Sequence, residues 1–442
     1  MQVLKFGGTS VGSVENMIAV RHIIDTPETK IVVLSAMSGT TNTLTQIADC
    51  ARDRNFKKFQ KLSNALQLQY DQVIDQLFTS KSLKAIVIGY VDEVFAEIDR
   101  LVQENTHSEI IDDAIVAQGE LLSTFIFSNF LKQEGLQASL LPALDFMRID
   151  SNQEPDKYYI KENVQRLLDK NSSGTIYITQ GFICRDFDGR VSNLQRGGSD
   201  YTATILGAAT GAKEVQIWTD IDGFHNNDPR FVEHTQALPV LSYDEAAELA
   251  YFGAKILHPQ TVQPLRAQKI PLRLKNTMRP KALGTLVTHK PAGKGVKAIA
   301  AKDGIIAIKI KSARMLQSHG FLSKVFEIFE RYETSIDMIT TSEIAISLTI
   351  DDDTHLIMIE KELSVFSQVT VDKDQSIICL VGNEVNRDTQ TPQLFQILRD
   401  VHVRMISYGG SDHNISLLVA TENKQHALQL LQGYMFQEEV SA

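Results

Sequence analysis

The sequence predicts an α/β protein in which a large domain with a largely parallel sheet precedes two small α+β modules. Three observations predict this organisation. Short apolar runs alternate with helical patterns through residues 1–290. The glycine- and lysine-rich stretch 289–296 is then typical of a linker. Beyond it, one pattern of strands and helices occurs twice.

Length and composition limit the class of protein. A chain of 442 residues is long enough for several domains of about 150 residues. A net charge of -10 argues against nucleic acid or an anionic membrane as the main partner. Three widely spaced cysteines predict neither a zinc site nor a disulfide framework. With no leader pattern and no run that approaches a membrane span, we expect a cytoplasmic protein.

The first strand is expected at the start of the chain. A short apolar run ends at Lys5, breaks at Gly7 and Gly8, and gives way to hydroxyl side chains and an amphipathic helix capped by Ser13. Paired glycines let the backbone approach a ligand closely, and the N–H groups at a helix start attract anions. Because Lys5 adds a positive charge, we expect a phosphate-binding turn.

Two alternatives for this turn stay open. One is an ordinary strand-turn-helix connection with a surface lysine, since Gly-Gly is common turn chemistry. The other is a nucleophile elbow, because residues 8–12 fit G-x-S-x-G, although no Asp and His partners are signalled. A Walker A loop is excluded because its motif does not occur.

The rest of the large domain continues the alternation of strands and helices. Strands are expected at 30–36, 138–141, 175–180 and 214–220, and helices at 56–105, 110–132, 160–168, 203–209 and after Ser242. In parallel sheets, ligands bind beyond the carboxyl ends of the strands. The loops rich in glycine, hydroxyl and charged side chains lie at those ends, which predicts the place of a site.

The C-terminal part is predicted to hold two copies of one module. Segments 335–342 and 403–410 align on their Met-Ile pairs. Each copy has a strand, a helix and paired strands, with the first strands at 305–310 and 377–381 and the helices at 322–331 and 394–401. This β-α-β-β order, followed by a further helix, is the ferredoxin-like arrangement. Such modules have exposed sheet edges, so we expect them to pair.

Six motifs in this order resemble those of the aspartokinases along the whole chain. They are Lys5-Phe-Gly-Gly-Thr-Ser10, Gln118-Gly-Glu120, Arg196-Gly-Gly-Ser-Asp-Tyr201, Trp218-Thr-Asp220, Asp228-Pro-Arg230 and Phe252-Gly-Ala-Lys-Ile-Leu-His-Pro259. The resemblance implies an amino-acid-kinase fold, a three-layer sandwich, over residues 1–290. It also implies ferredoxin-like ACT regulatory modules over 300–375 and 376–442. The chain is most similar to the lysine-sensitive, monofunctional type.

This resemblance implies transfer of the γ-phosphoryl group of MgATP to the side-chain carboxylate of L-aspartate. The product is 4-phospho-L-aspartate, on the route to lysine, threonine and methionine. Because a carboxylate is already ionised at neutral pH, no general base is required. The site must instead align two anions and neutralise the charge that spreads in the transition state.

The resemblance also assigns roles to matching positions. The catalytic residues would be Lys5, Arg196, Asp200 and Lys255, and the substrate would contact Ser35, Thr41, Glu120, Arg196 and Ser199. ATP with Mg²⁺ would contact Lys5, Gly7, Gly8, Thr219, Asp220, His225, Arg230 and Lys255, and no residue is assigned as a metal ligand.

Physical chemistry agrees with several of these roles and leaves others open. Arg196 suits a bidentate grip on a carboxylate, and Glu120 has the right charge for an ammonium group. Asp200 would orient the catalytic lysine or the metal. His225 departs from the family pattern, which usually has tyrosine there. Structural alternatives are a Glu120–Arg196 ion pair and turn or capping roles for the hydroxyls of Ser35 and Thr41.

The first ACT module resembles a lysine-binding module. Its matching residues are Met315, Ser318, Phe321, Leu322, Ile336, Asp337, Ser342 and Glu343. Amides at a helix start can receive a carboxylate, and the two acidic residues can receive ammonium groups. The alternative is that Met315, Phe321 and Leu322 only form the core of the module. We expect feedback inhibition by L-lysine, and a homodimer or dimer of dimers through the ACT modules.

Two other functions are kept as alternatives. One is a kinase of the same fold that acts on glutamate or another small acid, against which the Gln-Gly-Glu motif and the ACT pair count. The other is a catalytically silent amino-acid sensor, which the intact charged motif residues disfavour.

Overall fold

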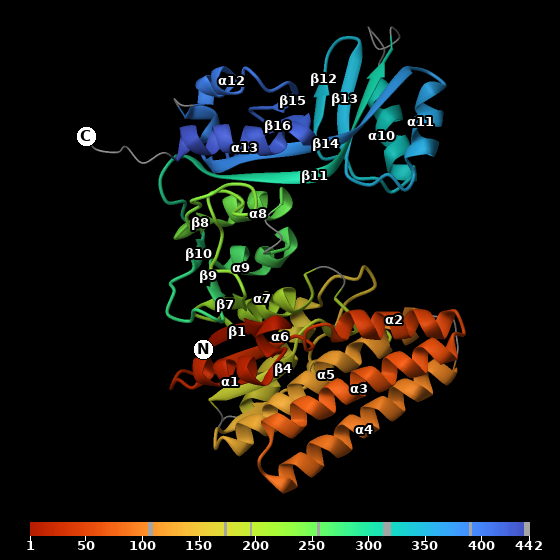
Figure 1. Cartoon of the computed structure of the whole chain (residues 1–442), viewed down its shortest axis with the longest axis vertical. Coiled ribbons are helices and arrows are strands. Elements are labelled where there is room, and N and C mark those ends of the chain that lie inside the picture. Colours follow the sequence, from red (N-terminus) through yellow and green to blue (C-terminus); the bar gives the residue numbers. More distant parts are fainter. Residues whose placement is uncertain are drawn as a thin grey trace, which may run out of the picture. The chain divides into compact units, whose positions relative to one another are not determined.

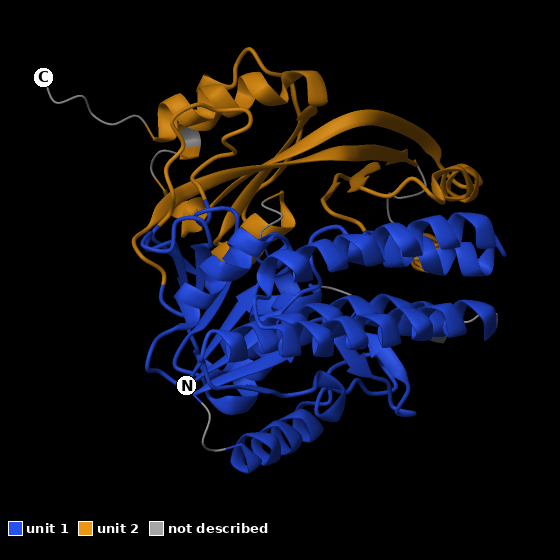
Figure 2. Cartoon of the chain, turned by 60° about the horizontal axis from the view of Figure 1, so that its bottom comes forward, with its two compact units in different colours: residues 1–224, 239–243, 257–290 blue, residues 225–238, 244–256, 291–442 orange. Residues whose placement is uncertain are grey.

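The computed structural model describes the chain except for residues 105–108, 172–174, 195–196, 254–256, 313–319, 389–390 and 437–442. The chain forms two compact units (Figure 2). Unit 1 comprises Met1–Phe224, Pro239–Tyr243 and Leu257–Lys290, and unit 2 comprises His225–Leu238, Asp244–Ile256 and Pro291–Ala442.

Unit 1 is built on an eight-stranded sheet of order β3-β4-β2-β1-β7-β9-β10-β8. The strands are β1 (Gln2–Phe6), β2 (Lys30–Leu34), β3 (Ala138–Leu140), β4 (Ile176–Gln180), β7 (Val215–Thr219), β8 (Val240–Ser242), β9 (Leu272–Asn276) and β10 (Thr285–Thr288). Neighbours pair in parallel except β9 with β10. A separate hairpin joins β5 (Ile183–Arg185) and β6 (Val191–Asn193). The largely parallel sheet predicted from the alternation is confirmed.

Helices cover both faces of this sheet (Figure 1). They are α1 (Val14–Ile24), α2 (Thr40–Arg52), α3 (Phe56–Leu77), α4 (Lys81–Glu104), α5 (Glu109–Gln133), α6 (Lys157–Lys170), α7 (Gly198–Thr210) and α9 (Gln263–Gln268). The predicted helical stretch 56–105 is two helices, α3 and α4, which pack on each other. Ser13 caps α1 as predicted, because its side chain accepts a hydrogen bond from Asn16 N.

The side chains of β1 point alternately to the two faces of the unit 1 sheet. Leu4 and Phe6 are buried in the hydrophobic cluster shared with α2 and α5. Because successive side chains of a strand point to opposite faces, Val3 and Lys5 project toward the other face, where α7 packs on β1. The motif lysine is thereby directed to the α7 side of the central strand.

Helix α5 corrects the expectation that no run of the sequence approaches the length and hydropathy of a membrane span. Its segment Ile111–Gln133 is long and apolar enough to span a membrane, with a mean hydropathy of 1.3 over the most apolar window. No such run was expected from the sequence. However, 78% of that window is buried inside the protein, and Leu122, Ile126 and Phe127 are fully enclosed. An apolar helix buried in this way is typical of the core of a soluble protein.

Unit 2 contains a six-stranded antiparallel sheet of order β12-β13-β11-β14-β16-β15. The strands are β11 (Gly295–Lys311), β12 (Ile339–Thr341), β13 (Ala345–Ile350), β14 (Gln368–Asn383), β15 (Val403–Ser407) and β16 (Asn414–Ala420). The helices are α8 (Tyr243–Tyr251), whose first residue lies in unit 1, α10 (Phe321–Arg331), α11 (Leu356–Ser364), α12 (Leu394–Ile397) and α13 (Thr421–Met435). Both predicted β-α-β-β patterns are present.

The two modules share one continuous sheet. Strands β11 and β14 are 17 and 16 residues long and pair with each other along most of their length. Each module nevertheless has its own hydrophobic cluster, one around α10 and α11 and the other around α13. The predicted linker is therefore shorter than expected, because β11 already begins at Gly295.

Candidate active site

The best-defined contact at the predicted site joins Lys5 and Asp200. Lys5 lies on β1, and Asp200 lies in the first turn of α7, which starts after Gly197 in a left-handed conformation at φ 75°. The Lys5 Nζ and the Asp200 Oδ1 are 2.7 Å apart, and the two side chains are 12% and 18% exposed. An acidic residue also suits the first turn of a helix electrostatically. The structure therefore brings together two residues that lie far apart in the sequence.

The glycines after β1 allow two loops to pack closely. A Cβ atom at Gly8 would lie 2.9 Å from the carbonyl oxygen of Ala36, in the loop after β2. The Gly7 N–H donates to the Trp218 carbonyl oxygen at 3.3 Å and so continues the pairing of β1 with β7. The predicted glycine turn is present, but the Gly7 amide is engaged by the protein itself.

Glu120 lies on α5 and is almost completely buried, with 2% exposure. Its Oε1 accepts a hydrogen bond from Ala36 N at 3.1 Å, while its Oε2 has no hydrogen-bond partner in the described part of the chain. Burial raises the pKa of Glu120 to about 8, against the lowering effect of the Ala36 N–H and the charge of Lys5. Gly119 permits this position, because a Cβ there would lie 2.9 Å from the Ala36 Cβ.

Two predicted substrate hydroxyls meet each other. Ser35 Oγ donates to Ser199 Oγ at 2.9 Å, which links the end of β2 to the start of α7. Thr41 lies in the first turn of α2, where its carbonyl oxygen accepts from the Thr45 hydroxyl. Its neighbour Thr40 is fully buried and bonds to the Tyr70 hydroxyl at 3.0 Å.

The end of β7 is held by the predicted residues Thr219 and Asp220 together with two polar residues that the motifs did not predict, Asn276 and Thr277. Thr219 Oγ1 donates to Asp220 Oδ1 at 3.0 Å. At the end of β9, Asn276 Nδ2 donates to the Asp220 carbonyl oxygen, and Thr277 N donates to the Thr219 carbonyl oxygen. The Thr277 hydroxyl also lies 2.7 Å from that of Ser10. The available signal was a polar Asn-Thr pair directly after a strand, at the same edge as the known motifs.

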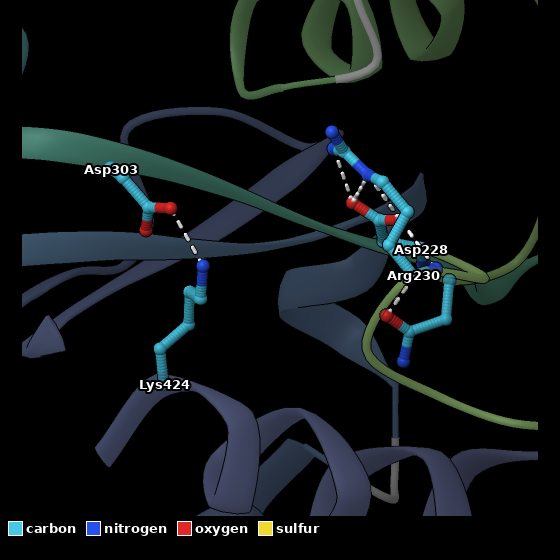
Figure 3. A network of polar contacts seen from close by, with 5 residues as sticks. Asp228, Arg230, Asp303 and Lys424 are labelled. Atoms are coloured by element: carbon cyan, nitrogen blue, oxygen red, sulfur yellow. Dashed lines mark hydrogen bonds and ion pairs between the residues drawn. The ribbon is translucent and has the colours of Figure 1, made fainter. Parts of the chain in front are cut away.

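Two other predicted nucleotide residues, His225 and Arg230, belong to unit 2. The His225 Nδ1 lies 3.0 Å from the Thr235 hydroxyl. The Arg230 side chain is 75% exposed, and its guanidinium forms hydrogen bonds of 2.6, 3.0 and 3.1 Å with the Asp228 carboxylate (Figure 3). Arg196 and Lys255 lie outside the described residues, so their predicted roles stay predictions.

The predicted effector residues of the first module divide into core and surface. Phe321 is buried in the module core, as the structural alternative proposed, whereas Leu322 is 40% exposed and is not a core residue. Ile336 packs against the same core, while Ser342 and Glu343 are exposed. Met315 and Ser318 lie outside the described residues.

Asp337 is the most constrained of these effector residues, with a side chain that is 1% exposed. Its Oδ1 accepts from Lys302 Nζ at 2.9 Å and from the Tyr251 hydroxyl at 2.6 Å. Its Oδ2 is buried and has no hydrogen-bond partner among the residues that the structure describes. One oxygen of this carboxylate therefore has unused capacity to accept hydrogen bonds.

Comparisons with known proteins agree with this architecture. The amino acid kinase family model matches residues 1–276, and the ACT domain model matches 308–355 and 378–433. Lysine-sensitive aspartokinase 3 of Escherichia coli is 34% identical over 98% of this chain and 99% of its own length. The chloroplastic aspartokinase 1 of Arabidopsis thaliana is 35% identical over 98% of this chain and 80% of its own length.

Solved structures give the same result. E. coli aspartokinase III in complex with aspartate and ADP has a TM-score of 0.85 at 33% identity, and the match covers 99% of this chain and 100% of that chain. The same E. coli enzyme in complex with lysine and aspartate has a TM-score of 0.83 at 32% identity, with the same coverage. The predicted amino-acid-kinase fold with ACT modules is confirmed. The chain belongs to the aspartokinase family, with an amino acid kinase domain followed by ACT domains.

Proposed function

We propose that this protein is an aspartate kinase, which transfers the γ-phosphoryl group of ATP to the side-chain carboxylate of L-aspartate. The observation that carries the proposal is the oriented Lys5–Asp200 pair at the carboxyl end of the central strand. A fixed cation at this place can neutralise charge on the transferring phosphoryl group. The E. coli relative, whose solved structure holds aspartate and ADP, supports this choice of substrates.

In this proposal Glu120 receives the α-ammonium group of aspartate. Its Oε2 is buried and has no hydrogen-bond partner among the described residues, and an ammonium group bound there would favour the ionised carboxylate, whose charge has the opposite sign. Ser35 and Ser199 then present hydroxyls to substrate oxygens, while Thr41 contributes from the first turn of α2. Arg196 is proposed to hold a substrate carboxylate, and Lys255 to act with Lys5 on the phosphates.

The nucleotide is proposed to bind through Thr219, Asp220, His225 and Arg230 and the glycine turn after β1. Mg²⁺ would accompany it and neutralise phosphate charge. No group of three or more His, Cys, Asp or Glu side chains suited to a metal occurs among the described residues. Kinases hold Mg²⁺ through nucleotide phosphates with one or two carboxylates, so a larger group of acidic residues is not required. The carboxylates proposed for this task are Asp200, in the first turn of α7, and Asp220, directly after β7.

Regulation by L-lysine is proposed for the first ACT module. The E. coli relative is named lysine-sensitive, and one of its structures contains lysine. In this chain, Asp337 Oδ2 can accept a hydrogen bond from an ammonium group. The other residues proposed to form the lysine site are Met315, Ser318, Phe321, Leu322, Ile336, Ser342 and Glu343.

We also propose the domain boundaries 1–290, 300–375 and 376–442, a cytoplasmic location, and a homodimer or dimer of dimers. Strands β12 and β15 are the terminal strands of the unit 2 sheet and contact each other, and each is hydrogen-bonded to one described strand only, so we propose pairing between copies through them.

The direct test is aspartate-dependent consumption of ATP, with the acyl phosphate trapped by hydroxylamine as a hydroxamate. Hydroxamate is expected with aspartate and not with glutamate. A folded protein that forms no hydroxamate with either acid would favour the silent sensor. Glutamate as the better substrate would favour the other kinase.

A further inference from the structure

The loop that carries the Asp-Pro-Arg motif is anchored in the second regulatory module. Val232 is buried in the hydrophobic cluster that contains Ile299 of β11 and Leu428 of α13. The Asn226 carbonyl oxygen accepts from Ile299 N at 2.8 Å, and Asn227 Nδ2 donates to Gln432 Oε1 of α13 at 3.1 Å. The backbone on both sides of Arg230 is thus fixed by contacts with the second module.

A buried lysine of α13 lies beside this loop. Lys424 is 6% exposed, and its Nζ is 2.6 Å from Asp303 Oδ2 on β11 (Figure 3). The same Nζ lies 3.8 Å from the centroid of the Phe231 ring, and the Arg230 Cζ lies 5.7 Å from that centroid. Both distances are within the range of a cation–π interaction. Phe231 therefore stands in contact with both cations.

The charges of this group act on each other beyond the direct pairs. Burial tends to raise the pKa of Asp228, but hydrogen bonds from Arg230 and the charges of Arg230 and Lys424 lower it overall. Burial likewise tends to raise the pKa of Asp303, but Lys424, Ser376 and the charge of Arg230 lower it. The two acids and two bases form one electrostatic group, in which Lys424 supports the carboxylate that holds Arg230.

We propose that Lys424 is a positioning residue for Arg230, so that helix α13 of the second ACT module takes part in binding the nucleotide. The inference depends on the nucleotide role of Arg230 in the proposed function. An exposed arginine has many rotamers, and its affinity for a phosphate rises when neighbours hold it in place beforehand. Lys424 does this by fixing Phe231 through its charge and by stabilising ionised Asp228.

A buried aliphatic side chain of the same length would fill the space of Lys424 without paying for desolvation of a charge. Filling the core therefore does not by itself require a lysine here. The ammonium acts on Phe231 and Asp228, both of which flank Arg230 in the sequence. A positioning role therefore requires the charge of Lys424, whereas a structural role requires only its bulk. A neutral variant of similar size should weaken nucleotide binding in the first case and leave it unchanged in the second.

The test compares variants of the full chain by calorimetric titration with ADP and by steady-state kinetics. Lys424→Met keeps the aliphatic stem and removes the charge. We expect it to raise the ADP Kd and the KM for ATP about three- to tenfold, with the KM for aspartate unchanged. Lys424→Arg keeps a cation over the ring and should stay near the original values. Lys373→Met is the matched control, since Lys373 forms an exposed pair with Asp353 at 3.2 Å.

Several outcomes would overturn the proposal. Folded Lys424→Met with unchanged ADP affinity, beside a weakened Arg230→Met, would show that Lys424 does not position Arg230. Equal weakening in Lys373→Met or in Lys424→Arg would show that the loss does not arise from the cation over Phe231. Unchanged ADP affinity in Arg230→Met would instead refute the nucleotide role of Arg230, and the inference with it.

A second variant covers the case in which Lys424→Met does not fold. Asp303→Asn removes the ion pair that anchors Lys424 while changing a side chain that is itself 51% exposed, so the Lys424 ammonium loses the partner that holds it in place. We expect weaker ADP binding in the same direction as Lys424→Met. Unchanged ADP affinity in this folded variant would overturn the proposal.

Discussion

Replacing Glu120 by glutamine tests whether a buried carboxyl has been kept at the substrate site at the expense of stability. The pKa of Glu120 is about 8 in the folded protein, compared with an ordinary value of 4.5. The folded state therefore binds the Glu120 proton more tightly than the unfolded state. The contribution of this proton to stability is complete below pH 4.5 and is lost as the pH rises to about 8.

The size of the effect follows from proton linkage. Each pH unit between the two pKa values changes the free energy of unfolding by about 1.4 kcal/mol. Between pH 5 and pH 8 the wild type should therefore lose on the order of 3 kcal/mol through this one group. Glutamine keeps an oxygen for the Ala36 N–H but cannot ionise, so Glu120→Gln should lack this part of the pH dependence.

The assay is urea unfolding of the unliganded protein at both pH values, followed by circular dichroism. A constant offset is expected from the buried amide, and only the difference between the two pH values carries the test. Glu360→Gln, at an exposed position on α11, is the control and should follow the wild type. A wild type and a Glu120→Gln variant with the same pH dependence would refute the claim that Glu120 is held protonated by burial.

Three further predictions concern the site and its regulation. Lys5→Ala should lower kcat by about a thousandfold or more with an unchanged circular dichroism spectrum, because the phosphoryl group loses its fixed cation; near-normal turnover would contradict the role of Lys5. Gly119→Ala should cost about 1–3 kcal/mol in urea unfolding, since its Cβ would meet Ala36 at 2.9 Å, while Gly89→Ala, with open space around it, is the control. Asp337→Asn should raise the lysine concentration for half-inhibition by about tenfold or more; unchanged inhibition would place the effector elsewhere.

Much of the kinase unit could be predicted from sequence because its signals are local. The apolar runs of β1, β2 and β4 and the cap at Ser13 each depend on a few neighbouring residues. The Lys5–Asp200 contact was accessible only through the resemblance of the motifs, because no local pattern joins residues so far apart. The two side chains meet in the fold because β1 is a central strand and α7 begins beside it.

Other features could not be predicted because they depend on tertiary packing. Residues 225–238 carry the Asp228-Pro-Arg230 motif and residues 244–256 carry the start of the motif at 252–259, yet both segments fold with the regulatory modules. The burial of Val232 among residues of β11 and α13 decides this, and those partners are distant in the chain. Similarly, the pairing of Asp337 with Lys302 depends on a sheet register that composition does not reveal.

The wrong expectation for α5 has a different cause, because its long apolar segment is visible in the sequence itself. An apolar segment of this length satisfies a membrane span by composition, and only its burial among α2, α4 and the sheet shows that it is a core helix. The unpredicted residues Asn276 and Thr277 are a related case. No strand was expected at 272–276, and no motif marked these two residues.

The central claim is that the carboxyl ends of the unit 1 strands hold both reactants in line. A crystal structure with aspartate and a non-hydrolysable ATP analogue tests it most directly. We expect the aspartate ammonium on Glu120 Oε2 and the γ-phosphate beside Lys5, facing the aspartate side chain. Aspartate bound away from Glu120, or a γ-phosphate out of reach of Lys5, would contradict it.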